Sequence, residues 1–187
     1  DLDPDLPQTL LDLKRAGKKL FLATNSEWHY TRPIMRHVFN GRLGDLGWRD
    51  LFDLVIVEAK KPAFFERRAP FFEVLDDDGN ERPAEAPLRA GAIYRGGDAE
   101  AVQQHLGMDG GEILYVGDHV YADVHVTSRI RRWRTALVLR ELEDEVLAEQ
   151  LFGVEQRQLE DLMREKVALD EEQAALRLAL LRVEHGD

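Results

Sequence analysis

The chain has 187 residues and a formal net charge of −11, from 25 basic and 36 acidic residues. Hydrophobic residues make up 44% and charged residues 33%, which is typical of a soluble globular protein with a sizeable core. The acidic excess argues against nucleic-acid binding, which depends on a basic surface. No apolar run reaches the ~20 residues of a membrane span, so no membrane partner is expected. The lack of cysteine excludes disulfides and thiolate metal sites and fits a reducing, cytoplasmic compartment.

The chain opens with a predicted helix, a strand and a second helix. Leucines at helical spacing between Leu6 and Ala16, followed by Gly17, indicate an amphipathic helix with a glycine stop. Residues 18–26 (KKLFLATNS) predict a short buried strand that ends in small polar residues. The next helix is expected to use Thr31 as its N-cap, with a proline in its first turn and a glycine past its end.

The middle of the chain predicts a strand, a hairpin and a short helix. Residues 52–59 (FDLVIVEA) indicate a strand, and residues 60–65 (KKPAFF) a loop, because a proline disfavours helix in the residue before it. Residues 70–95 contain two apolar segments around a stretch rich in Asp, Gly and Pro, which predicts a β-hairpin insertion. Asp98 is expected to cap a short helix that Gly107 ends.

The remaining core elements are expected strands at 112–118 (EILYVGD) and 134–139 (RTALVL), with a helix near 121–131 between them. Strands therefore alternate with helices along the chain. This alternation predicts an α/β fold, a doubly wound parallel sheet of the Rossmann type flanked by helices.

The composition changes after residue 140, where Leu, Glu, Ala, Gln and Arg dominate. Residues 141–187 predict one long helix or two antiparallel helices, docked on the core as a C-terminal helical extension. We expect this segment to serve packing or homo-oligomer formation, because a long apolar stripe requires a covering surface. The predicted domains are therefore a core at 1–140 and an extension at 141–187.

Polar side chains follow three of the expected strands, and ligands of open α/β sheets bind at the carboxyl ends of the strands. The groups at the three strand ends are Thr24, Asn25 and Ser26, then Lys60 and Lys61, then Asp118 and Asp123. A hydroxyl can bond phosphoryl oxygens, a lysine can neutralise charge during phosphoryl transfer, and carboxylates can hold a hard cation such as Mg²⁺. The combination favours a phosphoryl-transfer site.

Each feature taken alone also has a structural explanation. Thr24 is compatible with a turn, Lys61 with a solvated loop, and Asp118 and Asp123 with acids placed at a helix start by the helix dipole. The phosphate-site interpretation depends on the three groups occurring together, each directly after a strand.

Three segments, FLATNS, KKP and GDHVYAD, resemble motifs II, III and IV of the haloacid dehalogenase (HAD) superfamily. Thr24 matches the Thr or Ser of motif II, Lys61 matches the lysine of motif III, and Asp118 with Asp123 matches the acidic pair of motif IV. Longer stretches such as FLATNSEWHYTRPIM and FDLVIVEAKKPAFF are similar to the cytosolic purine 5′-nucleotidases that prefer IMP and GMP. The likeness covers about residues 8–145.

This resemblance implies a HAD-like fold and a reaction. Members of the group hydrolyse purine nucleoside monophosphates through an aspartate nucleophile and a phospho-enzyme, with Mg²⁺ bound alongside. The roles implied for this chain are catalysis for Thr24, Lys61 and Asp123, phosphate binding for Thr24, Asn25, Ser26 and Lys61, metal binding for Asp118, and a possible effector contact for Tyr121.

The motif that carries the nucleophile, DxDxT after an apolar strand, is not recognisable in this sequence. Asp1 to Asp3 (DLD) is rejected, because no apolar strand precedes it and Pro4 follows it. We expect the chain to belong to a longer protein, to lack the strand at the sheet centre, and to have little or no phosphatase activity alone.

Two alternative functions remain open at this stage. One is a HAD phosphatase that acts on a different phosphomonoester, because the recognisable motifs contact phosphate and not the base. The other is a non-catalytic module that binds nucleotides or supports assembly.

Overall fold

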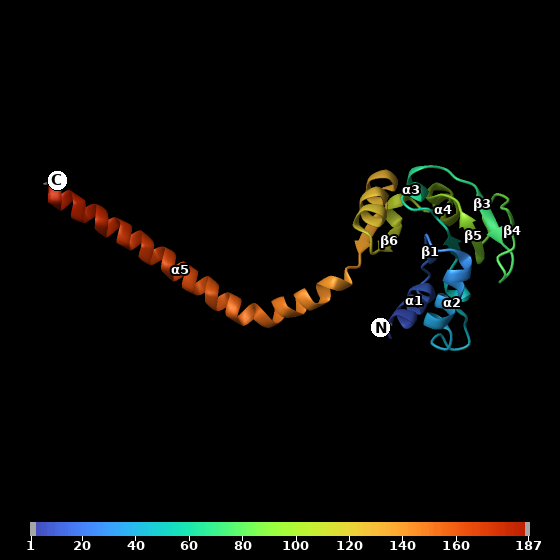
Figure 1. The fold of residues 1–187 in the computed structure, drawn as a ribbon, viewed down its shortest axis with the longest axis horizontal. Helices are drawn as coiled ribbons and strands as arrows, with labels where there is room; N and C mark the ends of the chain where they lie inside the picture. Colours follow the sequence, from blue (N-terminus) through green and yellow to red (C-terminus); the bar gives the residue numbers. More distant parts are fainter. Residues whose placement is uncertain (1–2, 186–187) are drawn as a thin grey trace. The chain divides into compact units, whose positions relative to one another are not determined.

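The computed structural model describes residues 3–185, apart from the side chains of Ala122 and Val124. The chain divides into two compact units, Asp1–Val138 and Leu139–Asp187. The first unit is an α/β domain in which helices flank a mixed sheet, and the second is almost wholly helical (Figure 1).

The main sheet has five strands in the order β1-β2-β5-β3-β4. β1 (Phe21–Ala23), β2 (Leu54–Val57) and β5 (Ala92–Gly96) run parallel, whereas β3 (Phe71–Val74) and β4 (Glu81–Pro83) run antiparallel to their neighbours. All four residues of β2 are buried, as expected for an inner strand. The sheet is therefore mixed: its parallel part and the hairpin were expected, but the hairpin strands belong to the same sheet and make it partly antiparallel.

The hairpin expected at 70–95 is present with one additional strand. The two apolar segments expected to pair, β3 and β5, are antiparallel neighbours in the sheet, and β4 forms a hairpin with β3 on its other side. β5 also pairs in parallel with β2, so the hairpin is joined to the main sheet. β4 was not expected, because all three of its residues are exposed and carry no apolar pattern.

A second sheet consists of β6 (Leu114–Gly117) and β7 (Arg134–Leu137), which run parallel. Among the described strands, β1 pairs only with β2, and β6 pairs only with β7. The open edges of β1 and β6 both line a cavity of about 410 Å³ with mainly apolar walls. Leu114 and Val116 of β6 are 53% and 55% exposed, so this strand presents uncovered apolar side chains.

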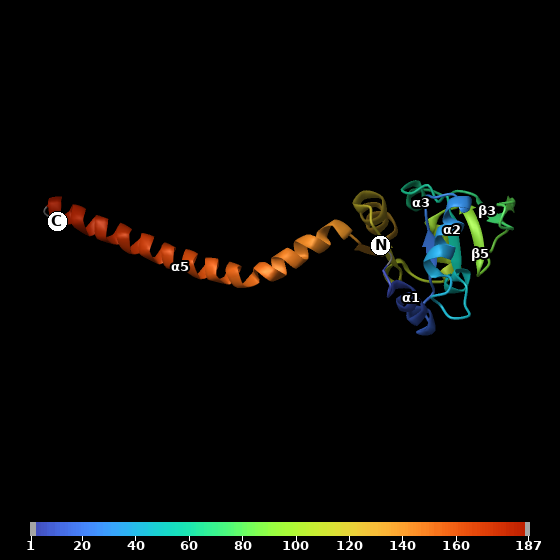
Figure 2. The same cartoon turned by 60° about the horizontal axis from the view of Figure 1, so that its bottom comes forward.

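Helices cover both faces of the main sheet. The α-helices of the first unit are α1 (Leu6–Arg15), α2 (Trp28–Phe39), α3 (Ala63–Glu66) and α4 (Ala99–Leu106), and its short 3₁₀ turns are η1 (Trp48–Leu51) and η2 (Gly110–Glu112). Figure 2 shows α2 lying across the strands. α1 and α2 contribute to one apolar core, whereas α3 and α4 contribute to the other.

Alternation along β2 divides its side chains between these two cores. Val55 and Val57 pack with the α1 and α2 side, whereas Leu54 and Ile56 pack with the α3 and α4 side. Successive side chains of a strand point to opposite faces, so one buried strand supplies both cores. The parallel pairing of β1 with β2 places the carboxyl ends of these two strands side by side.

Local signals predicted α4 well and α2 less well. Asp98 caps α4 by accepting a hydrogen bond from the Ala101 N–H at 3.0 Å, and Gly107 ends it with φ 65°. α2, however, begins at Trp28, so Thr31 lies inside the helix and is not its N-cap. Trp28 is 6% exposed and packs on Trp48, and burial of this ring favours the earlier start.

Two segments differ in conformation from the expectation, one predicted as a loop and one as an α-helix. Residues 60–65, expected as a loop, include the start of α3, in which the buried Phe64 and Phe65 anchor one helical turn. The helix expected at 121–131 consists of two π-helical segments, η3 (Val120–His125) and η4 (Thr127–Arg131). Wide π turns are rare and are frequently found at functional sites.

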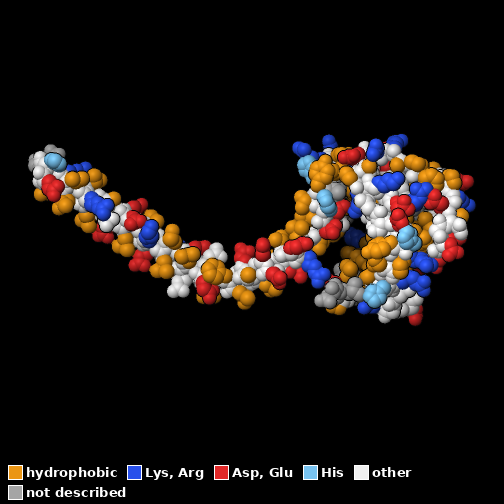
Figure 3. All heavy atoms as spheres, in the orientation of Figure 1, with side chains coloured by type: hydrophobic (Ala, Val, Ile, Leu, Met, Phe, Trp, Pro, Cys, Tyr) orange, Lys and Arg blue, Asp and Glu red, His pale blue; other side chains and the backbone are white. Residues whose placement is uncertain are grey.

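In the second unit, η5 (Arg140–Leu142) leads into α5 (Glu143–His185), one continuous helix of 43 residues. The alternative of two antiparallel helices is therefore wrong, since the helix continues through Gly153 (Figure 1). None of its described side chains is buried, and Figure 3 shows apolar and charged side chains interspersed along it. Within residues 3–185, no helix combines the length and apolar character that crossing a membrane requires.

Candidate functional site

The loops that follow β1 and β2 are joined by one side chain. The Oδ1 atom of Asn25 accepts a hydrogen bond from the Lys61 backbone N–H at 2.6 Å, and its Nδ2 donates to the Lys61 carbonyl at 3.2 Å. β1 and β2 are parallel neighbours, so both loops leave the sheet at the carboxyl ends of the strands. Asn25 therefore fixes the backbone from which the Lys61 side chain extends.

The loop after β2 has a strained backbone. Glu58 and Lys60 have φ values of 46° and 59°, in the left-handed region. For residues with a Cβ this conformation costs on the order of 1–2 kcal/mol, so it persists where the surroundings impose it. The Ala59 N–H donates to the Thr24 carbonyl at 2.9 Å, and the Glu58 N–H donates to the Ser26 carbonyl at 2.9 Å. The segment after β1 thus holds this loop in shape.

The Lys61 ammonium lies between two acceptors from the β6 side of the domain. Its Nζ atom is 3.0 Å from Asp123 Oδ1 and 3.0 Å from the Tyr115 hydroxyl. The side chain of Lys61 is 16% exposed and that of Asp123 2% exposed, so the ion pair is largely shielded from water. A shielded pair is held strongly, because loss of one partner leaves the other as an uncompensated buried charge.

The surroundings keep Lys61 and Tyr115 protonated at neutral pH. Burial lowers the pKa of Lys61, but hydrogen bonds and charge attraction from Tyr115 and Asp123 outweigh it, and the pKa lies above its ordinary value. Burial raises the pKa of Tyr115, Lys61 opposes this shift, and the charge and hydrogen bond of Asp123 add to it. The site therefore holds an ammonium ion beside a neutral phenol and a carboxylate.

Asp123 folds back onto the end of β6. A Cβ atom at Gly117 would lie 2.5 Å from the Cβ, Cγ and Oδ2 atoms of Asp123. The backbone N–H of His119 donates to Asp123 Oδ2 at 3.2 Å, and the Asp123 N–H donates to the His119 carbonyl at 2.9 Å. Glycine at position 117 is thus required by the close approach of the carboxylate.

Asp118 directly follows β6, and its side chain is exposed. Within the described residues, no group of three His, Cys, Asp or Glu side chains is arranged to hold a metal ion. Mg²⁺ usually takes one or two protein carboxylates and completes its shell with water and phosphate oxygens. The chemistry of Asp118 is compatible with one such ligand position, since Asp123 is already paired with Lys61.

Tyr121, the proposed effector contact, lies in η3 on the surface. It is 58% exposed, and its ring stacks on that of His125 at a centroid distance of 5.8 Å and an angle of 17°. An exposed, flat aromatic pair of this kind offers a stacking surface.

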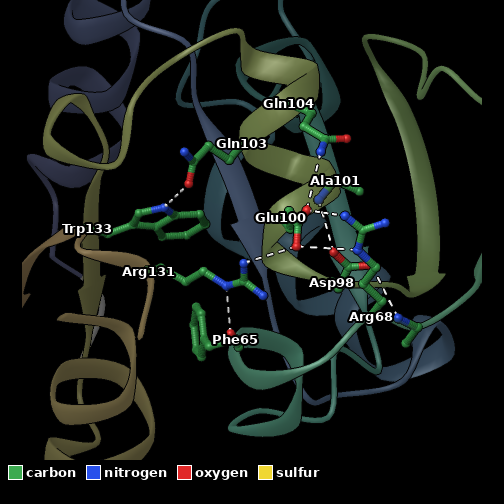
Figure 4. A network of polar contacts seen from close by, with 10 residues as sticks. Phe65, Arg68, Asp98, Glu100, Ala101, Gln103, Gln104, Arg131 and Trp133 are labelled. Carbon is green, nitrogen blue, oxygen red and sulfur yellow. Dashed lines mark hydrogen bonds and ion pairs between the residues drawn. The ribbon is translucent and has the colours of Figure 1, made fainter. Parts of the chain in front are cut away.

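A polar network joins α3, α4 and η4 (Figure 4). Arg131 of η4 donates from Nε to the Phe65 carbonyl of α3 at 2.7 Å, and from Nη1 to Glu100 of α4 at 3.5 Å. α3 follows Lys61 in the chain, and η4 follows Asp123. The same two segments are therefore joined twice, by the Lys61–Asp123 pair and by Arg131.

Sequence reasoning did not identify Tyr115 or Arg131. Tyr115 lies in an apolar run and resembles an ordinary core residue, and Arg131 lies in the run RIRRWR, which resembles a solvated helix end. Their partners, Lys61 and Phe65, are 54 and 66 residues away in the chain. No local spacing signals contacts over that range.

Comparisons with known proteins match nearly the whole chain. The model of the 5′ nucleotidase family matches residues 1–186. A 5′-nucleotidase domain-containing protein of Dictyostelium discoideum is 34% identical over 194 residues, which cover 97% of this chain and 32% of that protein. Human 5′-nucleotidase domain-containing protein 2 is 38% identical over 131 residues, which cover 70% of this chain and 24% of the human protein. The chain thus spans about a third or less of the length of these relatives.

Proposed function

Because this chain belongs to the 5′ nucleotidase family, we propose that the protein containing it is a HAD-type phosphohydrolase that converts purine nucleoside monophosphates to nucleoside and phosphate. The observation that carries the proposal is the contact of Lys61 with Asp123, on a loop that Asn25 anchors at the carboxyl ends of parallel strands. A lysine fixed at such a place stabilises negative charge on a transferring phosphoryl group.

The residues after β1 and β2 would bind the phosphate. Thr24 and Ser26 supply hydroxyl groups, Asn25 sets the loop, and Lys61 supplies the positive charge. Tyr115 and Asp123 together hold the lysine in its charged form, which its buried position would otherwise disfavour. We also assign Asp123 a direct part in catalysis, on the basis of its match to motif IV.

A divalent cation, Mg²⁺, would supply charge neutralisation between the phosphate and the protein when bound. In this chain Asp118 would be its carboxylate ligand. The exposed position of Asp118 beside β6 leaves it accessible to a hydrated ion.

The nucleophile would come from a strand between β1 and β6. The open edges of both strands line the same apolar cavity of about 410 Å³, and one extended segment paired to both would remove two unpaired edges. A carboxylate directly after that strand would lie at the carboxyl ends of the strands, where Lys61 also lies. Since this sequence contains no DxDxT after an apolar strand, we expect the chain alone to release little or no phosphate.

The test uses the full-length protein with IMP and GMP as substrates and Mg²⁺ in the buffer. We expect phosphate release that chelation of the metal abolishes, and a loss of at least ~100-fold in kcat for Lys61→Met. Lys60→Met is the matched control, because Lys60 is the neighbouring lysine with an exposed side chain. Equal activity of the Lys61→Met variant and the wild-type protein would refute the assignment.

The same assay separates the other two functions. Turnover of p-nitrophenyl phosphate or sugar phosphates, without turnover of purine nucleotides, indicates a phosphatase of another phosphomonoester. The phosphate-facing residues of this chain would serve that reaction equally well. Nucleotide binding without turnover indicates a non-catalytic module.

The remaining assignments concern partners and location. We propose a homo-oligomer in which the apolar side chains of α5 are covered, because leucines along most of its length are about half exposed or more. We propose a cytoplasmic protein that binds neither nucleic acid nor membranes, in keeping with its acidic charge of −11 and lack of cysteine.

A further inference from the structure

Tyr115 contacts the lysine of the site from a rigid position. Its ring is 6% exposed and packs against Phe65 at a centroid distance of 5.1 Å, Trp133 at 6.2 Å and Phe21 at 6.3 Å. The Trp133 indole N–H is in turn held by Gln103 at 2.9 Å. A ring enclosed on several sides has little freedom beyond rotation of its hydroxyl, so the oxygen atom has a fixed position.

The hydroxyl of Tyr115 completes a three-membered polar cluster. It accepts a hydrogen bond from Lys61 Nζ at 3.0 Å. Lys61 Nζ bonds Asp123 directly at 3.0 Å. The ammonium therefore has two acceptors in defined directions.

Geometry then determines the direction of the remaining N–H bond. An ammonium group carries three N–H donors in a tetrahedral arrangement. Two of them are directed at Tyr115 and Asp123, so the third has one orientation left. With Asp123 alone, the flexible lysine side chain could pivot about the Nζ–Oδ1 direction and carry Cε with it, and the other donors would sweep a cone.

We propose that Tyr115 is the positioning residue of Lys61, which with Asp123 orients the ammonium so that its third N–H meets a phosphoryl oxygen of the substrate. The inference rests on the proposed function and adds a residue to its site. Tyr115 touches neither the substrate nor the reacting atoms in this scheme and acts through Lys61.

The experiment compares Tyr115→Phe with Tyr94→Phe in the full-length protein. Tyr94 is a matched control, because it is 1% exposed and its hydroxyl also accepts one hydrogen bond, from the Arg89 N–H at 2.8 Å. Both variants lose one buried hydrogen bond and should melt a few degrees lower. Only Tyr115→Phe should lower kcat for IMP by about 10-fold and raise KM about 5-fold, because a misdirected lysine loses its contact with the phosphoryl group in the bound state and more so in the transition state.

Two further measurements make the outcome decisive. If Tyr115 acts through Lys61, the double variant Lys61→Met/Tyr115→Phe has the activity of Lys61→Met, and additive losses overturn the inference. The second is the affinity for inorganic phosphate, which needs no turnover and should fall about 5-fold in Tyr115→Phe but not in Tyr94→Phe. Absence of any hydrolysis by the wild-type protein refutes the proposed function, whereas equal phosphate affinity in wild type and Tyr115→Phe refutes the positioning role.

Discussion

The side-chain amide of Asn25 forms two hydrogen bonds with the backbone of Lys61, a residue 36 positions away in the chain. One bond uses the amide as donor and the other uses it as acceptor, so the two groups are complementary. This pairing ties the end of β1 to the loop after β2. It places the origin of the Lys61 side chain before any substrate is bound.

Replacement of Asn25 by alanine should therefore misplace Lys61. Each lost hydrogen bond costs about 0.5–1.5 kcal/mol, so we expect a loss of about 1–3 kcal/mol in unfolding free energy and at least a 10-fold lower kcat in the full-length protein. Asn25→Asp keeps the acceptor and loses the donor, and it should fall between alanine and wild type in stability. Urea denaturation and phosphate release measure the two effects. Wild-type kcat in Asn25→Ala would show that the loop keeps its shape without the amide.

Gly117→Ala tests the close approach of Asp123 to the end of β6. The added Cβ would lie 2.5 Å from three atoms of the Asp123 side chain, and the carboxylate would have to move away from Lys61. Overpacking of this kind costs about 1–3 kcal/mol. Gly111→Ala is the control, since a Cβ there meets no atom within 4 Å, and it should be close to neutral. The comparison uses thermal unfolding, and equal stability of the two variants would contradict the packing argument.

The sequence predicted those parts of the fold that depend on local signals. α4 was expected with both of its ends, because the Asp98 cap and the Gly107 stop act within a few residues. The start of α2 was missed, because it depends on burial of Trp28 against Trp48, which lies 20 residues further along the chain. The strand β4 was missed because its exposed residues carry no apolar pattern and it is held only by pairing with β3.

The candidate site was predictable to a similar extent. The rule that ligands bind at carboxyl ends of strands selected Asn25, Lys61 and Asp123, and the structure places these residues in contact. Their roles in binding and catalysis stay predictions. Tyr115 and the π-helical turn around Asp123 were missed, because an apolar run does not reveal which of its residues carries a contact across the domain.

The Lys61–Asp123 pair should show strong energetic coupling. Asp123→Asn leaves an ammonium that is largely shielded from water, and Lys61→Met leaves a carboxylate that is 2% exposed. Removal of one partner from such a pair costs about 3–5 kcal/mol. The double variant Lys61→Met/Asp123→Asn should recover part of the loss, with an interaction free energy of about 1–3 kcal/mol in a double-mutant cycle. Additive losses in urea denaturation would show that the two side chains do not stabilise each other.

Leucines of α5 should affect assembly and not turnover. Leu162, Leu169 and Leu176 recur every seven residues and are 57%, 57% and 64% exposed, so they form a stripe on one side of the helix. Replacing all three by glutamine preserves helix propensity and removes the apolar stripe. We expect a smaller assembly by sedimentation and unchanged kcat in the full-length protein, whereas Glu171→Gln should change neither. Loss of all turnover with unchanged assembly would indicate that α5 contributes groups to the site.

The raised pKa values of Lys61 and Tyr115 predict a loss of stability at alkaline pH. A group whose pKa is higher in the folded than in the unfolded state stabilises the fold fully below its unfolded pKa, and this contribution is lost as the pH rises through the folded pKa. The unfolded values are about 10 for tyrosine and about 10.4 for lysine. The unfolding free energy of the wild-type protein should therefore decline above about pH 10. Tyr115→Phe removes one of the two groups and weakens the shift of the other, so its decline should be shallower.

Urea denaturation at fixed pH values between about pH 8 and about pH 11 measures this difference, and differences between variants cancel the contributions of other titrating groups. Gly111→Ala is the control, because it changes no titrating group and leaves the contact between Lys61 and Tyr115 intact, so it should retain the wild-type slope. Parallel curves for wild type and Tyr115→Phe would mean that burial and the Lys61 contact do not perturb the phenol. A shallower curve would tie the alkaline limit of stability to the same hydroxyl group that we propose orients the lysine.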